Sequence, residues 1–328
     1  MQRYDEIDIL KGIAITYVLL GHAIILYPIN LHDIYWCHSL FKFVSFAHMP
    51  LFFLVSGFCC KSIIKTDYKE FLAKKVRRLI IPYIVFNFID IFPRALLPQL
   101  INRPMELSDS IKRIIFYGGE FWFLYTLFAI FVIFPLIQKI IKSNKQWQII
   151  LGIIFLLLQF INIKVKIFRL DSIFQYILFF YIGYIIKFYF ASLNIFYLKY
   201  IKNNLNILLL ISLPLWIFIS LIDYKSLFIK FIGTIFALIC LLSLVFRINH
   251  YKYLGIFKKI GEFSLQFYLL NGSLLLISRT IFVNTLGITN SLFIILLNML
   301  ITQGLSYFII TKIFMKYKFL KLISGQIV

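Results

Sequence analysis

Residues 9–28 read ILKGIAITYVLLGHAIILYP, an apolar run whose only basic side chains are Lys11 and His22. A run of about 20 residues is long enough to cross the hydrocarbon core of a bilayer as a helix. Eleven steps at about 3.6 residues per turn make almost three whole turns, so the two side chains point the same way, roughly 16 Å apart. Ionisable side chains inside a membrane helix are costly to keep there, and we therefore take both as candidates for a functional site.

The composition of the whole chain indicates the same class of protein. Hydrophobic residues make up 62% of the 328 residues and charged residues only 14%, with a mean hydropathy of +0.92. The apolar runs are continuous and do not alternate, which favours helices over a membrane β-barrel. We expect an all-α, polytopic transmembrane bundle.

Hydropathy predicts about ten spans. They are expected at residues 9–28, 39–60, 77–98, 120–140, 147–163, 172–190, 205–222, 227–246, 260–282 and 291–314. The first run is long and lacks a small-residue cleavage site, so it is expected to be a retained span. An even number of spans places both termini on one side of the membrane.

The distribution of basic residues predicts which side that is. Most of the 34 Lys and Arg residues fall on the inner side if the termini are cytoplasmic, and segment 61–78 is especially basic. The net charge of +21 is explained by this rule and by contact with anionic lipid headgroups. Nucleic acid is a poor partner, because the basic residues lie in short loops between spans.

No soluble domain is predicted. The longest connections, near 99–119 and 190–205, hold only some twenty residues each, so residues 1–328 are expected to form a single integral membrane domain. Any chemistry must then occur within the bundle or at its rim. The four cysteines lack metal-ligand spacing and are expected to be buried thiols, so no metal is expected.

Asp8 and His22 extend the feature around Lys11. Asp8 lies three residues before Lys11, so the two can pair on the helix surface. Acidic residues near a helix start also complement the macrodipole, but this does not explain His22, which lies deep in the span. His48 in the second span is expected at a similar depth, and Pro50 can open space beside it. The two histidines are therefore expected to face each other across one hairpin.

Arg77 and Arg78 adjoin the third apolar run directly. Basic residues flanking a span can simply reflect the inner-side bias, yet guanidinium groups are well suited to bidentate binding of phosphate. A phosphate-bearing cytoplasmic donor would dock well at this rim. Glu120 and Trp122 open the fourth span at the outer interface, where a tryptophan is expected as part of the aromatic belt.

Together these motifs resemble the acyltransferase-3 family of integral membrane enzymes, in its fucose 4-O-acetylase-like branch. The resemblance rests on DILKG at 8–12, His22 with ten residues between it and Lys11, FAHMPLFFLVSG at 46–57 and RRLIIP at 77–82. Weaker similarities extend over nearly the whole chain. Family members often have a histidine at the end of a late span, where this chain has Asn271.

The resemblance implies an acetyl-coenzyme A donor (acetyl-CoA) and an O-acetyl transfer to carbohydrate. His22 is then the expected general base, and His48 is expected to polarise the thioester carbonyl or to bind the acceptor. Lys11, Arg77 and Arg78 would bind the donor phosphates, while Asp8 orients Lys11. The expected acceptor is a cell-surface glycan or its lipid-linked precursor, and the expected location is a bacterial plasma membrane.

Two other classes of function remain open on the sequence alone. A transporter or flippase of a glycan or lipid precursor would explain ten spans with buried charges equally well. A non-catalytic membrane sensor on the same fold is the other. The spacing of Lys11 and His22 beside a cytoplasmic arginine pair favours the enzyme, since a transporter has no need of it. The sequence does not predict the oligomeric state.

Overall fold

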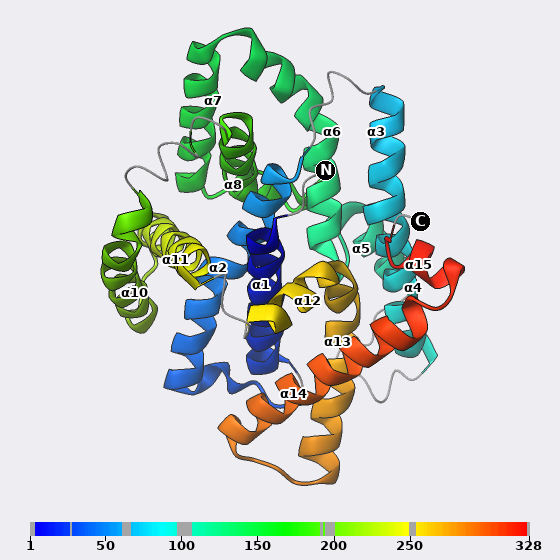
Figure 1. Cartoon of the computed structure of the whole chain (residues 1–328). Helices are drawn as coiled ribbons and strands as arrows, with labels where there is room; N and C mark the ends of the chain where they lie inside the picture. The colour runs from blue at the N-terminus through cyan, green and yellow to red at the C-terminus, as the bar shows by residue number, and fades with distance from the viewer. Residues whose placement is uncertain are drawn as a thin grey trace. The chain divides into compact units, whose positions relative to one another are not determined.

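The computed structural model describes residues 4–26, 28–60, 67–96, 107–190, 193, 201–248 and 254–326. Every regular element in these residues is a helix, and no strand occurs among them, which confirms the all-α prediction. Residues 61–66 of the basic segment 61–78 lie outside the described residues. Figure 1 labels the principal helices. Their bounds are α1 (Asp5–Ile25), α2 (Tyr35–Phe58), α3 (Tyr68–Lys75), α4 (Ile81–Leu96), α5 (Leu107–Tyr117), α6 (Trp122–Ser143), α7 (Lys145–Leu157), α8 (Leu170–Phe188), α10 (Leu205–Leu221), α11 (Leu227–Ile248), α12 (Gly255–Glu262), α13 (Ser264–Thr280), α14 (Ser291–Ile309) and α15 (Lys318–Ile323).

Eight helical stretches in the described residues are long and apolar enough to cross a membrane. They are Asp5–Ile25, Tyr35–Phe58, Leu107–Lys142, Ile167–Phe188, Lys202–Leu221, Leu227–Ile248, Ser264–Thr285 and Ser291–Phe314. Each overlaps one predicted span. The predicted span at 147–163 corresponds to the shorter helix Lys145–Phe160, and the one at 77–98 to α4 and the π-helical segment η3 (Val76–Ile80) before it. The count of ten spans and the cytoplasmic termini therefore stay predictions.

The chain packs into two compact units, which are described one at a time. Unit 1 contains Met1–Cys60 and Phe179–Tyr307, and unit 2 contains Lys61–Leu178 and Phe308–Val328. The first half of α8 thus belongs to unit 2 and its second half to unit 1. A single membrane domain over residues 1–328 stays a prediction.

In unit 1, α1 contacts α2, α12 and α13, and the pair α10–α11 packs against α2 (Figure 1). Glycines let the backbones meet: a β-carbon on Gly12 would overlap the carbonyl oxygen of Phe257 on α12. The same holds where α2 meets α8, because a β-carbon on Gly57 would overlap the carbonyl oxygen of Phe180. Small residues that permit close backbone contact are typical of helix packing in membranes.

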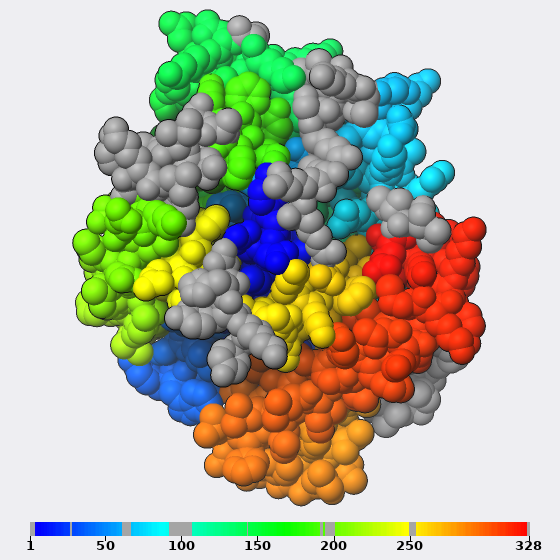
Figure 2. All heavy atoms as spheres, in the orientation of Figure 1, coloured from blue at the N-terminus to red at the C-terminus, as the bar shows by residue number. Residues whose placement is uncertain are grey.

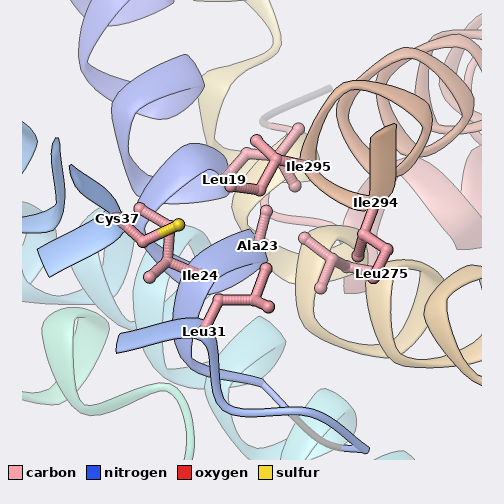
Figure 3. Packing of buried hydrophobic residues seen from close by; sticks show 8 residues of the cluster. All are labelled: Leu19, Ala23, Ile24, Leu31, Cys37, Leu275, Ile294 and Ile295. Carbon is pink, nitrogen blue, oxygen red and sulfur yellow. The ribbon is translucent and has the colours of Figure 1, made fainter. Parts of the chain in front are cut away.

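A buried apolar cluster joins the end of α1 to α13 and α14. Figure 3 shows its side chains converging from α1, from the loop that follows it, from the start of α2 and from α13 and α14. The members are Leu19, Ala23, Ile24, Leu31, Cys37, Leu275, Ile294 and Ile295. This packing fixes the end of α1 near which His22 lies, so the cluster positions the candidate site.

The outward faces of unit 1 are apolar as well. Leu300 on α14 is 70% exposed and Leu210 on α10 is 75% exposed. The side chains of α14, orange in Figure 2, spread over the surface of the unit. Faces with such exposed leucines would be unfavourable in water, so they are suited to contact with lipid.

Unit 2 contains α3 to α7, the first half of α8, and α15. Residues 118–121 form a turn between α5 and α6. Gly118 and Gly119 have φ angles of +77° and +54°, which only glycine adopts without strain. The predicted span at 120–140 therefore begins after a turn that the chain makes with two left-handed glycines.

Candidate functional site in unit 1

The first turns of α1 hold the predicted pair of Asp8 and Lys11. The Lys11 ammonium donates to the Asp8 carboxylate at 3.1 Å, and their side chains are 23% and 7% exposed. The helix crosses α12 at the same place, because a β-carbon on Gly261 would overlap the carbonyl oxygen of Asp8. The ion pair is thus held at a close contact between two helices, which supports the predicted role of Asp8 in orienting Lys11.

His22 lies in the last turn of α1 and is half-buried. The helix ends at Ile25, three residues earlier than the predicted end of the span at residue 28. Leu26, the residue that caps the helix, already has extended backbone geometry, with φ −75° and ψ 152°. His22 is therefore about one turn from the end of its helix, closer to it than the sequence suggested.

Arg279 on α13 holds this end of α1. Its side chain is fully buried, and its Nη1 and Nη2 atoms donate to the carbonyl oxygens of Ala23 and Ile29. A cation suits the end of a helix, where carbonyl groups lack intrahelical partners. Arg279 was not predicted as a site residue; its signal in the sequence is an arginine inside the predicted span at 260–282.

His48 lies on α2, half-buried and two residues before Pro50. Its Nδ1 atom is 2.7 Å from the carbonyl oxygen of Val44. A carbonyl oxygen only accepts hydrogen bonds, so Nδ1 carries the proton and neutral His48 has its lone pair on Nε2. Its free nitrogen can therefore accept a hydrogen bond and cannot donate one.

His22, His48 and Lys230 come together in unit 1. Both His22 and Lys230 lie close enough to His48 for an electrostatic interaction with its imidazole. The prediction that the two histidines are neighbours agrees with this arrangement. Lys230, one turn into α11, was not singled out from the sequence, because a lysine near the end of a span usually reflects a side chain reaching for the interface.

Lys230 differs in its partners from three other lysines of unit 1. Lys11 pairs with Asp8, Lys42 with Asp223 at 3.0 Å, and Lys258 with Asp5 at 2.7 Å. Within the described part of the chain, no carboxylate lies within ion-pair distance of Lys230. Its ammonium is therefore a charge that a substrate can use.

Arg77 and Arg78 lie in unit 2, on segment η3. Both side chains are exposed, and no carboxylate pairs with either among the residues that the structure describes. The neighbouring Lys74 is different, because it pairs with Glu70 and its hydrogen bond lowers the pKa of that carboxyl. The two guanidinium groups are thus available to an anion, as their positions in the sequence predict.

Comparison with known proteins gives this arrangement its context. A family model described as an acyltransferase domain matches residues 4–312, which include every candidate site residue described above. The chain belongs to the acyltransferase-3 family. The match runs through both units and thus confirms the resemblance seen in the motifs of the first 82 residues.

Two curated relatives of this acyltransferase-3 chain are nodulation proteins NolL. The chain is 26% identical over 140 residues to NolL of Mesorhizobium japonicum, covering 42% of this chain and 36% of that protein. It is 28% identical over 128 residues to NolL of Sinorhizobium fredii, covering 38% of this chain and 34% of that protein. The chain therefore matches about a third of the length of these relatives. No solved structure matches.

Asn271 marks the departure from the acyltransferase-3 pattern noted in the sequence. It is buried in α13 at 2% exposure, and its Oδ1 atom has no hydrogen-bond partner among the described residues. A buried amide without a partner is costly, so such a group is a natural contact for a polar ligand. As for metals, no three His, Cys, Asp or Glu side chains in the described residues gather to hold one.

Proposed function

We propose that this membrane acyltransferase transfers an acetyl group from acetyl-CoA to a hydroxyl of a cell-surface glycan or its lipid-linked precursor, in a bacterial plasma membrane. Family membership supports acyl transfer. The observation that carries the finer proposal is the grouping of His22, His48 and Lys230 within one unit of membrane helices. The two imidazoles can supply a base and the ammonium supplies a cation. A hydroxyl needs both groups when it attacks a thioester.

His22 acts as the general base. It takes the proton of the acceptor hydroxyl while the hydroxyl oxygen bonds to the thioester carbonyl carbon. The resulting oxyanion collapses, the carbon–sulfur bond breaks, and the proton on His22 passes to the departing thiolate of coenzyme A. Proton transfer by a positioned side chain typically contributes about 10²–10⁴-fold.

His48 binds the acceptor. The sequence is compatible with two roles for His48, polarising the thioester carbonyl or binding the acceptor. Its Nδ1 proton is donated to the carbonyl oxygen of Val44, so neutral His48 has no other proton to donate to a thioester carbonyl. Its Nε2 atom accepts a hydrogen bond from a second hydroxyl of the sugar, which orients the hydroxyl that reacts at His22.

Lys230 stabilises the oxyanion. Replacing it by methionine keeps most of the length and apolar character of the side chain and removes the charge. We expect kcat to fall by about 10²-fold or more, with little change in KM for either substrate, because the interaction forms only in the transition state. Steady-state kinetics of Lys230→Met test this. A raised KM with an unchanged kcat would contradict the role.

Arg77 and Arg78, with Lys11, bind the phosphates of the donor. Replacing Arg77 or Arg78 by glutamine is expected to raise KM for acetyl-CoA about tenfold, because each guanidinium contributes charge-assisted hydrogen bonds. Lys74→Gln is the matched control, since Lys74 is a nearby cation that already pairs with Glu70. Equal effects of all three substitutions on KM would contradict a specific phosphate site.

The proposed function is tested with purified protein in detergent and acetyl-CoA labelled in the acetyl group. Acceptors are bacterial surface glycans and lipid-linked oligosaccharides, and both free thiol and labelled acceptor are measured. We expect equal amounts of the two products. Thiol release without labelled acceptor for any glycan, or no release at all, would contradict the proposal.

A further inference from the structure

The loop between α7 and α8 contains three basic side chains that the proposed chemistry does not use. Lys164, Lys166 and Arg169 lie within six residues of unit 2, and both lysines are exposed. In the predicted topology this loop joins the fifth span to the sixth on the outer side of the membrane. The inner-side bias of basic residues therefore does not explain the three cations, and their presence needs another reason.

The three cations have no carboxylate within ion-pair distance in the part of unit 2 that the structure describes. The ion pairs found there engage other basic side chains, Lys74, Lys112 and Arg113. Asp171 is the nearest acidic residue along the chain, and its carboxylate accepts hydrogen bonds from the N–H and the hydroxyl of Ser172 at 2.8 and 3.3 Å. The loop is thus a concentration of positive charge that is available to an anion from outside the protein.

Aromatic side chains hold Arg169 in place. Its guanidinium carbon lies 4.8 Å from the centre of the Trp122 ring, and Trp122 stacks in turn on Tyr176, with ring centres 5.9 Å apart. A β-carbon on Gly118 would come within 2.9 Å of the Arg169 side chain, so the two-glycine turn lies against the same arginine. The Nε atom of Arg169 has no hydrogen-bond partner among the described residues. The guanidinium is therefore fixed by ring contacts, with hydrogen-bonding capacity left over.

The backbone of the loop is strained where it presents this arginine. Phe168 and Arg169 have φ angles of 53° and 54°, a left-handed geometry that residues other than glycine rarely adopt. The Asp171 N–H closes the turn by donating to the carbonyl oxygen of Val165 at 3.0 Å. Two strained residues in succession are costly, and such strain is concentrated at functional sites. The backbone thus indicates that the placement of these two side chains serves a purpose.

Exposed apolar side chains alternate with the cations. Ile161, Val165 and Phe168 are 55%, 49% and 49% exposed. The Phe168 ring contacts that of Phe116 on α5, with ring centres 5.8 Å apart, and Phe116 is exposed as well. Apolar and aromatic side chains beside cations are typical of protein surfaces at the boundary between lipid tails and headgroups. A soluble anion would contact the cations alone, whereas a lipid contacts both kinds of side chain.

We propose that residues 161–169 bind the headgroup phosphate of an anionic phospholipid in the outer leaflet. Lys164, Lys166 and Arg169 contact the phosphate, and the apolar side chains of the loop lie against the acyl chains. An anionic lipid is preferred to a zwitterionic one, because a zwitterionic headgroup carries a cation that the three basic residues repel. The inference concerns the lipid around the protein and does not rest on the proposed function, since binding is measured without turnover.

The test is photo-crosslinking of the purified full chain in phosphatidylcholine nanodiscs. The probes are phosphatidylglycerol and phosphatidylcholine, each with a diazirine in the acyl chain near the headgroup, and mass spectrometry measures labelling of the peptide that contains residues 161–169. We expect phosphatidylglycerol to label this peptide about tenfold more than phosphatidylcholine does. The double variant Lys164→Gln/Lys166→Gln is expected to lose most of this preference, because each lysine near an anionic headgroup contributes several-fold. Both lysines are exposed, so the variant should melt like wild type.

Lys145→Gln is the matched control, because Lys145 is an exposed lysine at the opposite end of α7 and loses the same charge. It should keep the wild-type preference at residues 161–169. Equal labelling of wild type by the two probes, an unchanged preference in the double variant, or an equal loss in Lys145→Gln would overturn the inference. Displacement of phosphatidylglycerol by excess inorganic phosphate or by a soluble anionic oligosaccharide would identify a soluble ligand and would overturn it as well. If the double variant melts early, the two single lysine variants decide the question by the same measurement.

Discussion

His22→Ala is expected to lower acetyl transfer by about 10²–10⁴-fold, the largest catalytic effect in the chain. The substitution removes the imidazole that accepts the acceptor proton and leaves the apolar packing around Leu19 and Ala23 in place. Helix α1 keeps its length, since alanine is a good helix former. The measurement is labelled acceptor formed per minute, with thiol release followed in parallel.

His32→Ala is the control for this experiment. His32 lies on the same unit in the segment η1 (Leu31–Asp33), where its ring contacts His38 at a centroid distance of 4.3 Å. We expect near wild-type transfer from this variant and equal thermal melting of both proteins. Activity of His22→Ala within about threefold of wild type would remove His22 from the mechanism, and would direct attention to Nε2 of His48 as the base.

Gly261→Ala is expected to have the largest effect on stability, about 1–3 kcal/mol or more. The added methyl group would overlap the carbonyl oxygen of Asp8, so α12 must move away from α1. A backbone oxygen cannot rotate aside as a side-chain terminus does. The displaced helix would also disturb the contact at Gly12, so the loss is expected to be cooperative. Thermal unfolding in detergent, followed by helical circular dichroism, measures the change.

Gly255→Ala provides a matched control within the same helix. No atom lies within 4 Å of the position that its β-carbon would take. Alanine has the higher helix propensity, so this variant should be as stable as wild type or slightly more stable. Equal melting temperatures for Gly261→Ala and Gly255→Ala would refute the close packing of α1 on α12.

The spanning helices could be predicted from the sequence because their signal is local. Runs of about 20 apolar residues determine a membrane helix almost irrespective of context. The same locality explains the errors at the ends. The first span was predicted to reach residue 28, yet α1 ends at Ile25, since hydropathy does not register where the backbone leaves helical geometry.

Part of the candidate site was also predictable. Lys11 pairs with Asp8 because three residues along a helix make neighbours, and this spacing is visible in any sequence. Lys230 was missed because its relation to His48 depends on how α11 packs against α2, more than 180 residues along the chain. No periodicity in a single sequence reveals such a contact.

A polar hollow of unit 2, which Asp90 and Glu120 help to line, could not be predicted for a similar reason. Asp90 and Glu120 are read separately as residues near the ends of two spans. Their common location depends on Asn87. Its side-chain oxygen accepts a hydrogen bond from the backbone N–H of Glu120, which lies 33 positions later in the sequence. The two glycines at 118–119 indicate a turn, but which amide the turn passes over is decided by tertiary packing.

Arg279 has a consequence for the order in which the protein matures during synthesis. Ala23 and Ile29, whose carbonyl oxygens it contacts, leave the ribosome some 250 residues before the arginine that holds them. The first helix can enter the bilayer early, with both of its candidate site residues, Lys11 and His22, already present. Its end acquires its final partner only after α13 has been made. Nascent chains that stop short of Arg279 therefore contain His22 and His48 without the clamp that sets the end of α1 near His22.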